Sequence, residues 1–329
     1  MPSGNKLLPT IAALATALLA SASLAQAQTY PDKPIRVLNA FAAGTASDVI
    51  PRIILEKAAS LLGPKASFVF ENLPGAGGNN GTAQGLRRDP DGYTIIATAI
   101  GPLSINKILF KSLPYDPETD LEPITPSAQL SNVVVVSNKS GITSLKQLIE
   151  QTKANPDKFT YSSVGPGSSQ HLGAVLFSQL TGSQMRHLPY RVTGQLVTDL
   201  VTGEVPLSFQ NITNVKEQFT AGNLKILAIG AKARHPALPT VPTSAEAGLP
   251  ELITSAWFAF VAPKGTPKPI VDKLNGAIVA ALKDKEIVAK LNNFGADPMP
   301  MAPGEFKTFI GSEVVRWRDI IKKAGLPQM

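Results

Sequence analysis

The residues in this chain whose types and spacing best suit chemistry are the glycines of a short turn. Residues 68–70 (Phe-Val-Phe) are typical of a β-strand, Gly75, Gly77 and Gly78 follow, and a helix-like stretch begins near Thr82. Backbone amides at the start of a helix attract anions, because the unpaired N–H groups and the helix dipole point the same way. Glycine has no Cβ to hold a ligand away from those amides. The pattern therefore indicates an anion site or, as an alternative, a tight turn without a ligand.

The same turn does not match the pattern of a dinucleotide-binding loop. The third glycine of G-x-G-x-x-G would fall at Asn80. No acidic residue ends a strand at the distance where such a site holds the ribose. The chain has no cysteine, and His171, His187 and His235 lack the spacing of metal ligands. The sequence therefore predicts neither a cofactor nor a bound metal.

Residues 1–27 have the three parts of a secretory signal peptide. Lys6 is the single charge ahead of an Ala- and Leu-rich stretch, and Ala25 and Ala27 place small residues at the positions that determine cleavage. An uncleaved membrane anchor is the alternative, but the stretch is marginal in length and contains several Ser and Thr residues. We therefore expect a mature chain that begins near Gln28 and works outside the cytoplasm.

The composition is that of a folded exported protein that does not bind nucleic acid. The formal net charge of +7 comes from dispersed basic residues, with no run longer than Arg87-Arg88 or Lys322-Lys323. A moderately positive field favours small anions. Two tryptophans and five tyrosines offer few surfaces for base stacking. The chain length suits two lobes or one large domain.

Strand-like segments alternate with glycine or serine turns and with helical patterns along the chain. The expected strands are 35–39, 68–70, 94–98, 133–136, 160–163, 185–190, 224–229 and 257–261. The expected helices are 49–62, 82–86, 145–152, a helix from 172, another ending near 200, 270–283, 285–292 and 305–324. This alternation predicts an α/β fold with mainly parallel sheets. Ligands of such sheets bind beyond the carboxyl ends of the strands, where the glycine turns fall.

Several short segments form a specific signature when they are taken together. They are residues 30–35, 41–48, 71–78, 89–94, 161–172, 187–191, 239–243 and 262–267. In this order, and over essentially the whole mature chain, they resemble the periplasmic solute-binding proteins of tripartite tricarboxylate transporters, often called the Bug family. Each segment is weak alone, but the set is specific.

The resemblance implies a two-lobed α/β fold of the periplasmic-binding-protein type (type II-like, a Venus flytrap) with a mainly parallel sheet in each lobe. Residues 28–129 and 255–329 would form the first lobe, and residues 130–254 would form the second. Two strands would cross between the lobes. A hinge motion about these strands would close the lobes around a ligand.

The resemblance also implies a function in transport. The ligand would be a small carboxylate, aromatic or aliphatic, with one or two carboxyl groups, held between the lobes. Backbone amides, hydroxyls and bridging waters bind such an anion without a counter-cation. The protein would act as a monomer, would not be an enzyme, and would deliver the carboxylate to the membrane components of a tripartite tricarboxylate transporter.

The chain departs from the family pattern at four places. Residues 42–45 read Ala-Ala-Gly-Thr where the family usually has a proline and two glycines. Val192 stands where glycine is common, Arg191 replaces the usual lysine, and Gln210 lies near a position where an acid is expected. A β-branched Val192 would narrow the space between the lobes, which favours a carboxylate with an apolar or aromatic body.

The predicted ligand-binding residues come from the turns of both lobes. They are Ala43, Gly44, Thr45, Ala46, Asp48, Ala76, Gly77, Gly165, Gly167, Ser168, His171, Arg191, Val192 and Gln210. Structural roles stay open for three of them. The carboxylate of Asp48 could accept hydrogen bonds from backbone amides in the first turn of a helix. His171 could be a buried structural histidine, and Arg191 could be a solvated surface charge.

Two other functions stay open at this point. An exported hydrolase with an unrecognised nucleophile is the first, although Ser168 and Ser169 fail the G-x-S-x-G pattern because no glycine stands two residues beyond either serine. A receptor that presents its ligand to a membrane sensor, rather than to a permease, is the second. The sequence does not separate a sensor partner from a transporter.

Overall fold

The computed structural model describes residues 30–156, 158–190 and 192–328. The predicted signal peptide and the predicted ligand residue Arg191 lie outside the described residues. Within the described part of the chain, no helix is long and apolar enough to cross a membrane.

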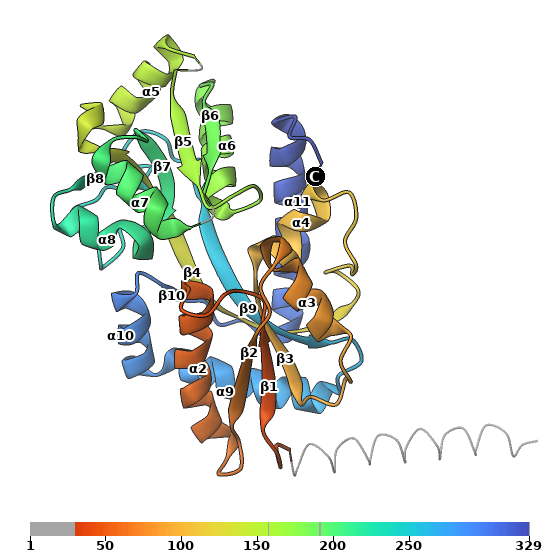
Figure 1. The fold of residues 1–329 in the computed structure, drawn as a ribbon. Helices are drawn as coiled ribbons and strands as arrows, with labels where there is room; N and C mark the ends of the chain where they lie inside the picture. Colours follow the sequence, from red (N-terminus) through yellow and green to blue (C-terminus); the bar gives the residue numbers. More distant parts are fainter. Residues whose placement is uncertain (1–29, 157, 191, 329) are drawn as a thin grey trace, which may run out of the picture.

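The first lobe is built on three parallel strands (Figure 1). β1 (Ile35–Asn39) lies between β2 (Phe68–Asn72) and β3 (Thr94–Ala99), with Ile35 opposite Phe68. Every residue of β3 is buried. Parallel strands are covered on both faces by helices, so their sequences read as apolar runs, as β3 does.

Two helices cover one face of this first sheet. α2 (Ala46–Leu62) and α9 (Lys268–Lys283) lie against each other, although they are far apart in the sequence. Their apolar residues recur at helical spacing, and Ile50, Ile54 and Leu274 are fully buried in one core. The C-terminal part of the chain therefore completes the lobe that the N-terminal part begins.

The second lobe repeats the parallel arrangement. β5 (Thr160–Ser163) lies between β6 (Arg186–Pro189) and β7 (Leu207–Asn211), and all three strands run parallel. α6 (Ser169–Thr181) follows β5 directly, and α7 (Thr193–Thr202) follows β6. Each strand therefore leads through a short turn into a helix, as in the first lobe.

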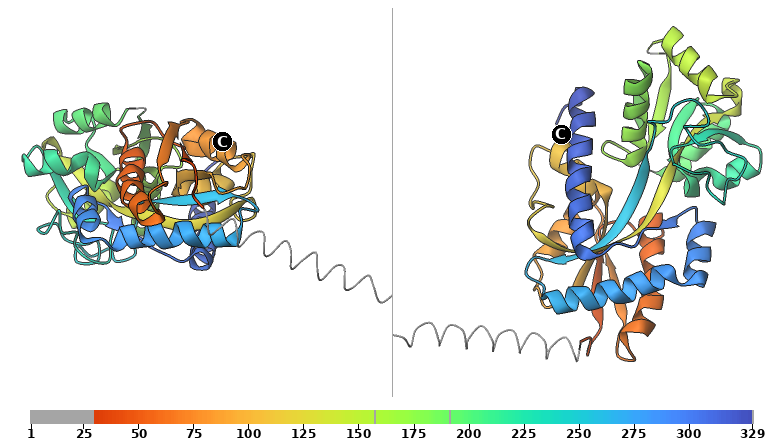
Figure 2. Two further views of the ribbon diagram at one scale, coloured as in Figure 1. Left: turned by 90° about the horizontal axis from the view of Figure 1, so that it is seen from below. Right: turned by 180° about the vertical axis from the view of Figure 1, so that it is seen from behind.

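Two long strands cross between the lobes. β4 (Leu121–Ser137) pairs antiparallel with β9 (Ser255–Pro263) as far as Ser131, and from Asn132 onward it pairs with β7. In the view from behind, the two strands run side by side from one lobe to the other (Figure 2). The sheets are thus parallel in their outer parts and antiparallel where the crossing strands join them. The exact lobe boundaries at 129/130 and 254/255 stay a prediction.

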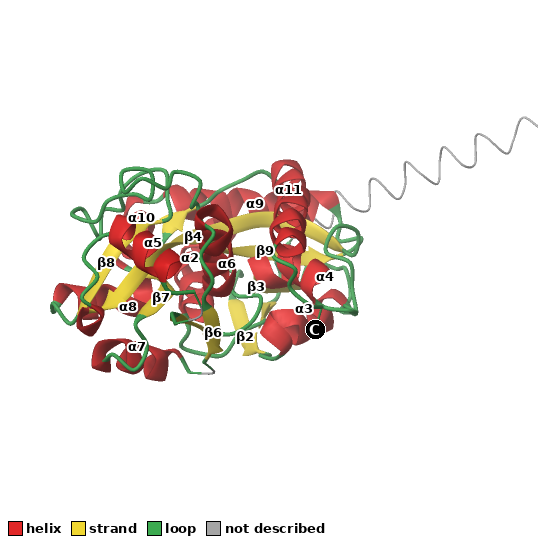
Figure 3. Ribbon diagram, turned by 90° about the horizontal axis from the view of Figure 1, so that it is seen from above, coloured by secondary structure: helices red, strands yellow, loops and turns green. Residues whose placement is uncertain are grey.

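The remaining elements are short connections and outer helices. They are η1 (Ala76–Gly78), α3 (Asn79–Leu86), the π-helical turn η2 (Gly101–Ile105), α4 (Asn106–Leu109), η3 (Asn138–Ser140), α5 (Leu145–Ala154), α8 (Ile212–Thr220), β8 (Leu224–Ile229), α10 (Lys285–Asn293), β10 (Asp297–Pro298) and α11 (Pro303–Lys323). Viewed from above, the strands lie between helices on both sides (Figure 3).

The sequence predicted most elements and missed a few. The expected strands 35–39, 160–163 and 224–229 have the observed bounds. β7 and the π-helical turn η2 were not expected. α7 begins at Thr193, and Val192 occupies its N-cap position without a side-chain hydrogen bond.

A buried carboxylate joins the crossing strand β9 to α11. Glu313 Oε2 accepts hydrogen bonds from the indole N–H groups of Trp257, at 3.0 Å, and of Trp317, at 3.1 Å. Arg316 pairs with the other oxygen at 3.2 Å. Glu313 is 6% exposed. The carboxylate therefore satisfies two indole donors that have no access to water.

We expect Glu313→Leu to lower the free energy of unfolding by about 2–4 kcal/mol, because it leaves two buried indole N–H groups without an acceptor. Glu313→Gln should lower the free energy of unfolding by less, since the amide oxygen of glutamine still accepts one hydrogen bond. Urea unfolding measures the difference. Asp319→Leu, at an exposed position on the same helix, is the matched control, and equal losses in the Glu313→Leu and Asp319→Leu variants would contradict the role of Glu313.

Candidate functional site

The turns that follow the parallel strands of both lobes form the candidate site. They are the β1–α2 turn (40–45), the β2–α3 turn (73–78), the β5–α6 turn (164–168) and the start of α7 at 192–194. Carboxyl ends of parallel strands are where ligands of α/β sheets bind. The sequence placed most of its candidate residues in these turns. Ala46 and Asp48 lie in the first turn of α2, His171 lies in α6 and Gln210 lies in β7.

The β2–α3 turn has an unusual backbone. Ala76, Gly77 and Gly78 have φ angles of +47°, +64° and +94°, and Ala76 is the one non-glycine residue of the described chain with a positive φ. Such a conformation costs an alanine roughly 1–2 kcal/mol, and strain of this kind clusters at ligand sites. The amides of Ala76 and Gly77 form no hydrogen bond within the described residues. They are therefore available to an anion.

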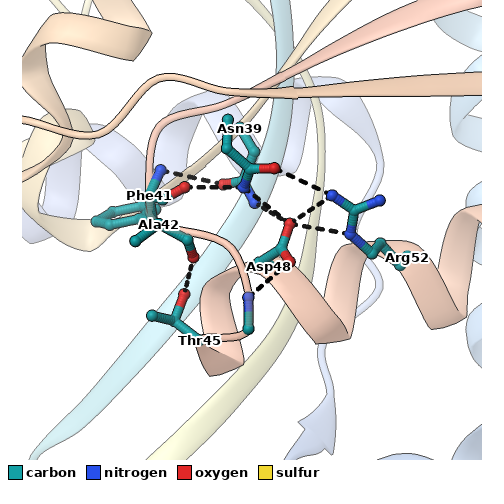
Figure 4. A network of polar contacts seen from close by, with 8 residues as sticks. Asn39, Phe41, Ala42, Thr45, Asp48 and Arg52 are labelled. Carbon is teal, nitrogen blue, oxygen red and sulfur yellow. Dashed lines mark hydrogen bonds and ion pairs between the residues drawn. The ribbon is translucent and has the colours of Figure 1, made fainter.

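The β1–α2 turn is held in place by the carboxylate of Asp48 (Figure 4). Oδ1 accepts hydrogen bonds from Asn39 Nδ2 and Asn72 Nδ2, each at 2.9 Å, and from Arg52 Nε at 3.0 Å. Oδ2 accepts the amide of Gly44 at 3.0 Å. Asp48 is 4% exposed, so this carboxylate is satisfied by the protein itself. It shapes the turn, and the structure leaves it little capacity to bind a ligand.

These bonds determine the ionisation of Asp48. Burial alone would raise the pKa of the carboxyl, but hydrogen bonds from Arg52, Asn72, Gly44 and Asn39 outweigh it and hold the pKa well below its ordinary range. Asp48 is therefore ionised, and its charge is neutralised by Arg52. Within the described residues, the amides of Ala42 and the predicted residue Ala43 in this turn, and those of Ala46 and Ser47 at the start of α2, form no hydrogen bond.

The β5–α6 turn uses most of its own amides. Gly165 donates to Ser163 Oγ at 3.1 Å, and Gly167 donates to His171 Nδ1 at 3.3 Å. Ser168 is the N-cap of α6, and its hydroxyl accepts from the amide of His171 at 3.2 Å. The predicted donors Gly165 and Gly167 are thus already paired. In the described chain, the amides of Val164 and of residues 169 and 170, at the start of α6, have no partner.

Asn106 brings the turns of the two lobes together. Its Nδ2 donates to Asn79 Oδ1 at 2.7 Å, which fixes the amide plane. A Cβ on Gly77 would lie 3.6 Å from Nδ2, and a Cβ on Gly167 would lie 3.3 Å from Oδ1 and 3.0 Å from Leu109 Cδ2. The predicted residues Gly77 and Gly167, from different lobes, therefore both lie against one side-chain amide.

Three other predicted residues have different surroundings. Val192 is 64% exposed at the start of α7. His171 is 5% exposed, and one ring nitrogen holds the β5–α6 turn from behind. Gln210 is fully buried in β7, where its amide donates to Ser208 Oγ and accepts from Asn214. Gln210 therefore has its polar atoms engaged inside the second lobe. Gly44 has nothing within 4 Å of its Cβ position, and Thr45 donates to the carbonyl of Ala42.

Sequence reasoning missed Asn79 and Asn106. Both are 3% exposed, and Tyr115 Oη also donates to Asn79 Oδ1, at 3.2 Å. Asn106 follows the π-helical turn η2, and π-turns occur frequently at functional sites. The signal that could have found Asn106 is its place in the mostly apolar stretch 102–110, since a buried amide needs specific partners. Asn79 lies between Gly78 and Asn80 and has no such signal.

The arrangement suits an anion and gives no sign of a catalytic or metal centre. α2, α3, α6 and α7 all begin at the candidate site, so their N-terminal dipoles favour negative charge there. Among the described residues, no group of three His, Cys, Asp or Glu side chains could hold a metal ion. Ser163 Oγ and His187 Nε2 lie 2.6 Å apart, but Ser163 is fully buried. The serine hydroxyl therefore supports the turn and is not open to a substrate.

Comparison with known proteins adds the family. The model of the tripartite tricarboxylate transporter family receptor matches residues 50–326. BugT of Bordetella pertussis is 36% identical over 300 residues, which is 91% of each chain. The resemblance seen in the sequence is confirmed.

Two solved structures are similar over nearly the whole described chain. Rpa4515 of R. palustris, a structure with adipate, is 31% identical with a TM-score of 0.83, and the match covers 91% of this chain and 100% of that one. MatC of Rhodopseudomonas palustris, with bound malate, is 29% identical with a TM-score of 0.78, covering 89% and 100%. The two-lobed periplasmic-binding-protein fold is therefore confirmed.

We expect Asp48→Asn to lower the free energy of unfolding by about 1.5–3 kcal/mol at neutral pH, because an amide nitrogen would face donors that now meet an oxygen. The pKa of Asp48 is lower in the folded chain, so its contribution is present above the ordinary aspartate pKa of about 3.9 and is lost as pH falls below it. The difference in the free energy of unfolding between the parent and Asp48→Asn should therefore decrease from about pH 5 to about pH 2.

Urea unfolding at a series of pH values measures this difference in the free energy of unfolding. Asp272→Asn is the control, because Asp272 is half exposed and, within the described chain, its ion pair is with Lys268 on its own helix. The stability difference between the parent and Asp48→Asn could stay constant down to pH 2, or it could equal the difference between the parent and Asp272→Asn. Either result would contradict the role given to the ionised carboxylate of Asp48.

Proposed function

We propose, on the premise that the chain belongs to the tripartite tricarboxylate transporter family of receptors, that it captures a small carboxylate between its lobes and delivers it to the membrane components of such a transporter. Proteins of this family are periplasmic binding proteins and not enzymes. The hydrolase alternative is therefore overturned. The binding role rests on the family, and the ligand class and the transporter partner are the proposal.

The observation that supports a carboxylate is the set of amides without partners at the candidate site. Ala76 and Gly77 supply two in the first lobe, and Ala46 and Ser47 supply two at the start of α2. An anion can accept several such N–H groups without a counter-cation. The nearby Asp48 does not oppose this, because Arg52 neutralises it.

The second lobe would complete the site with the same chemistry. The amides of residues 169 and 170 begin α6, and Gly167 already lies against Asn106 of the first lobe. A ligand with two carboxyl groups could therefore meet a helix N-terminus of each lobe. Two relatives of known structure hold dicarboxylates, adipate in Rpa4515 and malate in MatC.

The exposed side chain of Val192 bears on the size of the ligand. It is an apolar group at the start of α7, where a polar residue usually caps a helix. An apolar side chain there would contact the body of the ligand rather than its charged ends. We therefore propose that the carboxylate has an aliphatic or aromatic body. Arg191, beside it, stays a predicted partner of the carboxylate.

Titration calorimetry with the mature protein tests the ligand class. We expect adipate or malate to bind with a saturable heat, and glucose and putrescine to give none, because unpaired amides favour an anion over a neutral sugar or a cation. Saturable binding of glucose or putrescine, with neither acid bound, would contradict the proposal.

We expect Gly77→Val to weaken the binding of whichever acid binds the parent by at least about tenfold, since a branched side chain would occupy the space beside the free amides. Gly141→Val is the matched control. Gly141 has a similar φ of +69°, ends η3, and has nothing within 4 Å of its Cβ position. Both variants carry the same backbone strain, so equal affinities in the two would show that Gly77 is only a turn residue.

A further inference from the structure

A cavity of about 590 Å³ lies between the two lobes, apart from the free amides of the candidate site. One wall comes from the second lobe and includes Val175 and Ser178 of α6. The opposite wall comes from the first lobe and includes Leu109 of α4 and Leu326 after α11. Its volume lies in the usual range for small-molecule sites, about 300–1,000 Å³.

The lining of this cavity carries no formal charge. None of its described lining residues is Asp, Glu, Lys or Arg, although the chain contains 24 acidic and 31 basic residues. Burial lowers the pKa of both His171 and His187 to about 4, so both rings are neutral at neutral pH. A charged ligand would lose its hydration there without gaining a partner charge, and an uncharged one would not.

Three nearly parallel rings form one side of the cavity. His187 stacks on His171 with ring centroids 4.3 Å apart, and on Tyr161 with centroids 5.0 Å apart. The angles between the ring planes are 22° and 17°. Offset stacking of this kind favours a further aromatic ring over a branched aliphatic group.

One of these rings also offers a hydrogen bond into the cavity. Nδ1 of His171 accepts the amide of Gly167, so the proton of the neutral ring lies on Nε2. Nε2 has no partner among the described residues, and it is not one of their fully buried polar atoms without a partner, so it is open to the cavity that His171 lines. An oxygen acceptor in the cavity would give this N–H group a hydrogen bond.

We propose that this cavity is a second binding site, which takes an uncharged aromatic molecule with a hydroxyl or carbonyl oxygen. The ring of the molecule lies against the His171–His187 pair and the apolar side chains opposite, and its oxygen accepts the hydrogen bond of His171 Nε2. This site does not depend on the carboxylate site. It shares with that site only the β5–α6 turn, which His171 holds through Gly167.

Phenol and the three histidines of the chain allow a direct test. Nitrogen-resolved NMR of the imidazole groups is recorded while phenol is added to the mature protein. We expect saturable shifts of His171 and His187 and no shift of His235. His235 is the internal control, because it is 3% exposed and does not line the cavity.

A variant whose side chain fills the cavity shows whether the NMR shifts arise from phenol bound there. Ser178→Trp, at a half-buried position of the wall, should weaken phenol binding by at least about tenfold. Val315→Trp, at an exposed position of α11 outside the cavity, should leave it unchanged. If Ser178→Trp does not fold, Gln184→Trp at the exposed rim repeats the test.

Three results would overturn the proposal. The first is the absence of saturable shifts in His171 and His187. The second is an equal shift of all three histidines, which would indicate non-specific association of phenol. The third is unchanged phenol binding in a folded cavity-filling variant.

Discussion

The structure depends on one strand that belongs to two sheets. β4 is 17 residues long, and its backbone hydrogen bonds join β9 in the first half and β7 and β8 in the second. Each lobe has its own buried clusters, with Ile50 and Leu274 in one and Phe177 and Phe209 in another. Because both cores are anchored to the same strand, the turns of one lobe are kept opposite the turns of the other. The candidate site exists only through that placement.

Anion recognition in this chain is a property of the backbone more than of side chains. Among the described residues of the site, the groups without partners include the amides of residues 46, 47, 76, 77, 169 and 170, all near the start of a helix. The polar side chains around them are engaged in holding the turns. Asp48 binds Gly44, and His171 binds Gly167. A receptor built in this way can change its ligand through a few side chains at the rim, such as Val192, while the backbone site is kept.

The sequence predicted a strand or helix correctly where its residue types match the burial that the folded chain gives them. Residues 35–39 contain the apolar Ile35, Val37 and Leu38, two of them β-branched, and they form β1 with the expected bounds. β7 was missed because Ser208, Gln210 and Asn211 are polar, and only the folded chain supplies partners such as the carbonyl of Ser162. The glycine turns of the site were predicted in the same way. Which of their amides are free was not, because that depends on hydrogen bonds made by residues such as His171 and on the approach of Asn106 from the first lobe to Gly167 of the second.

Glu313 has a consequence for how this protein can be observed. The chain has two tryptophans, and both donate to the same carboxylate oxygen, one from the crossing strand β9 and one from α11. All intrinsic indole fluorescence therefore arises at a single junction, and neither ring belongs to the candidate site. A change in emission when a solute is added would report movement of β9 against α11. Such a signal would need no contact between a ligand and an indole.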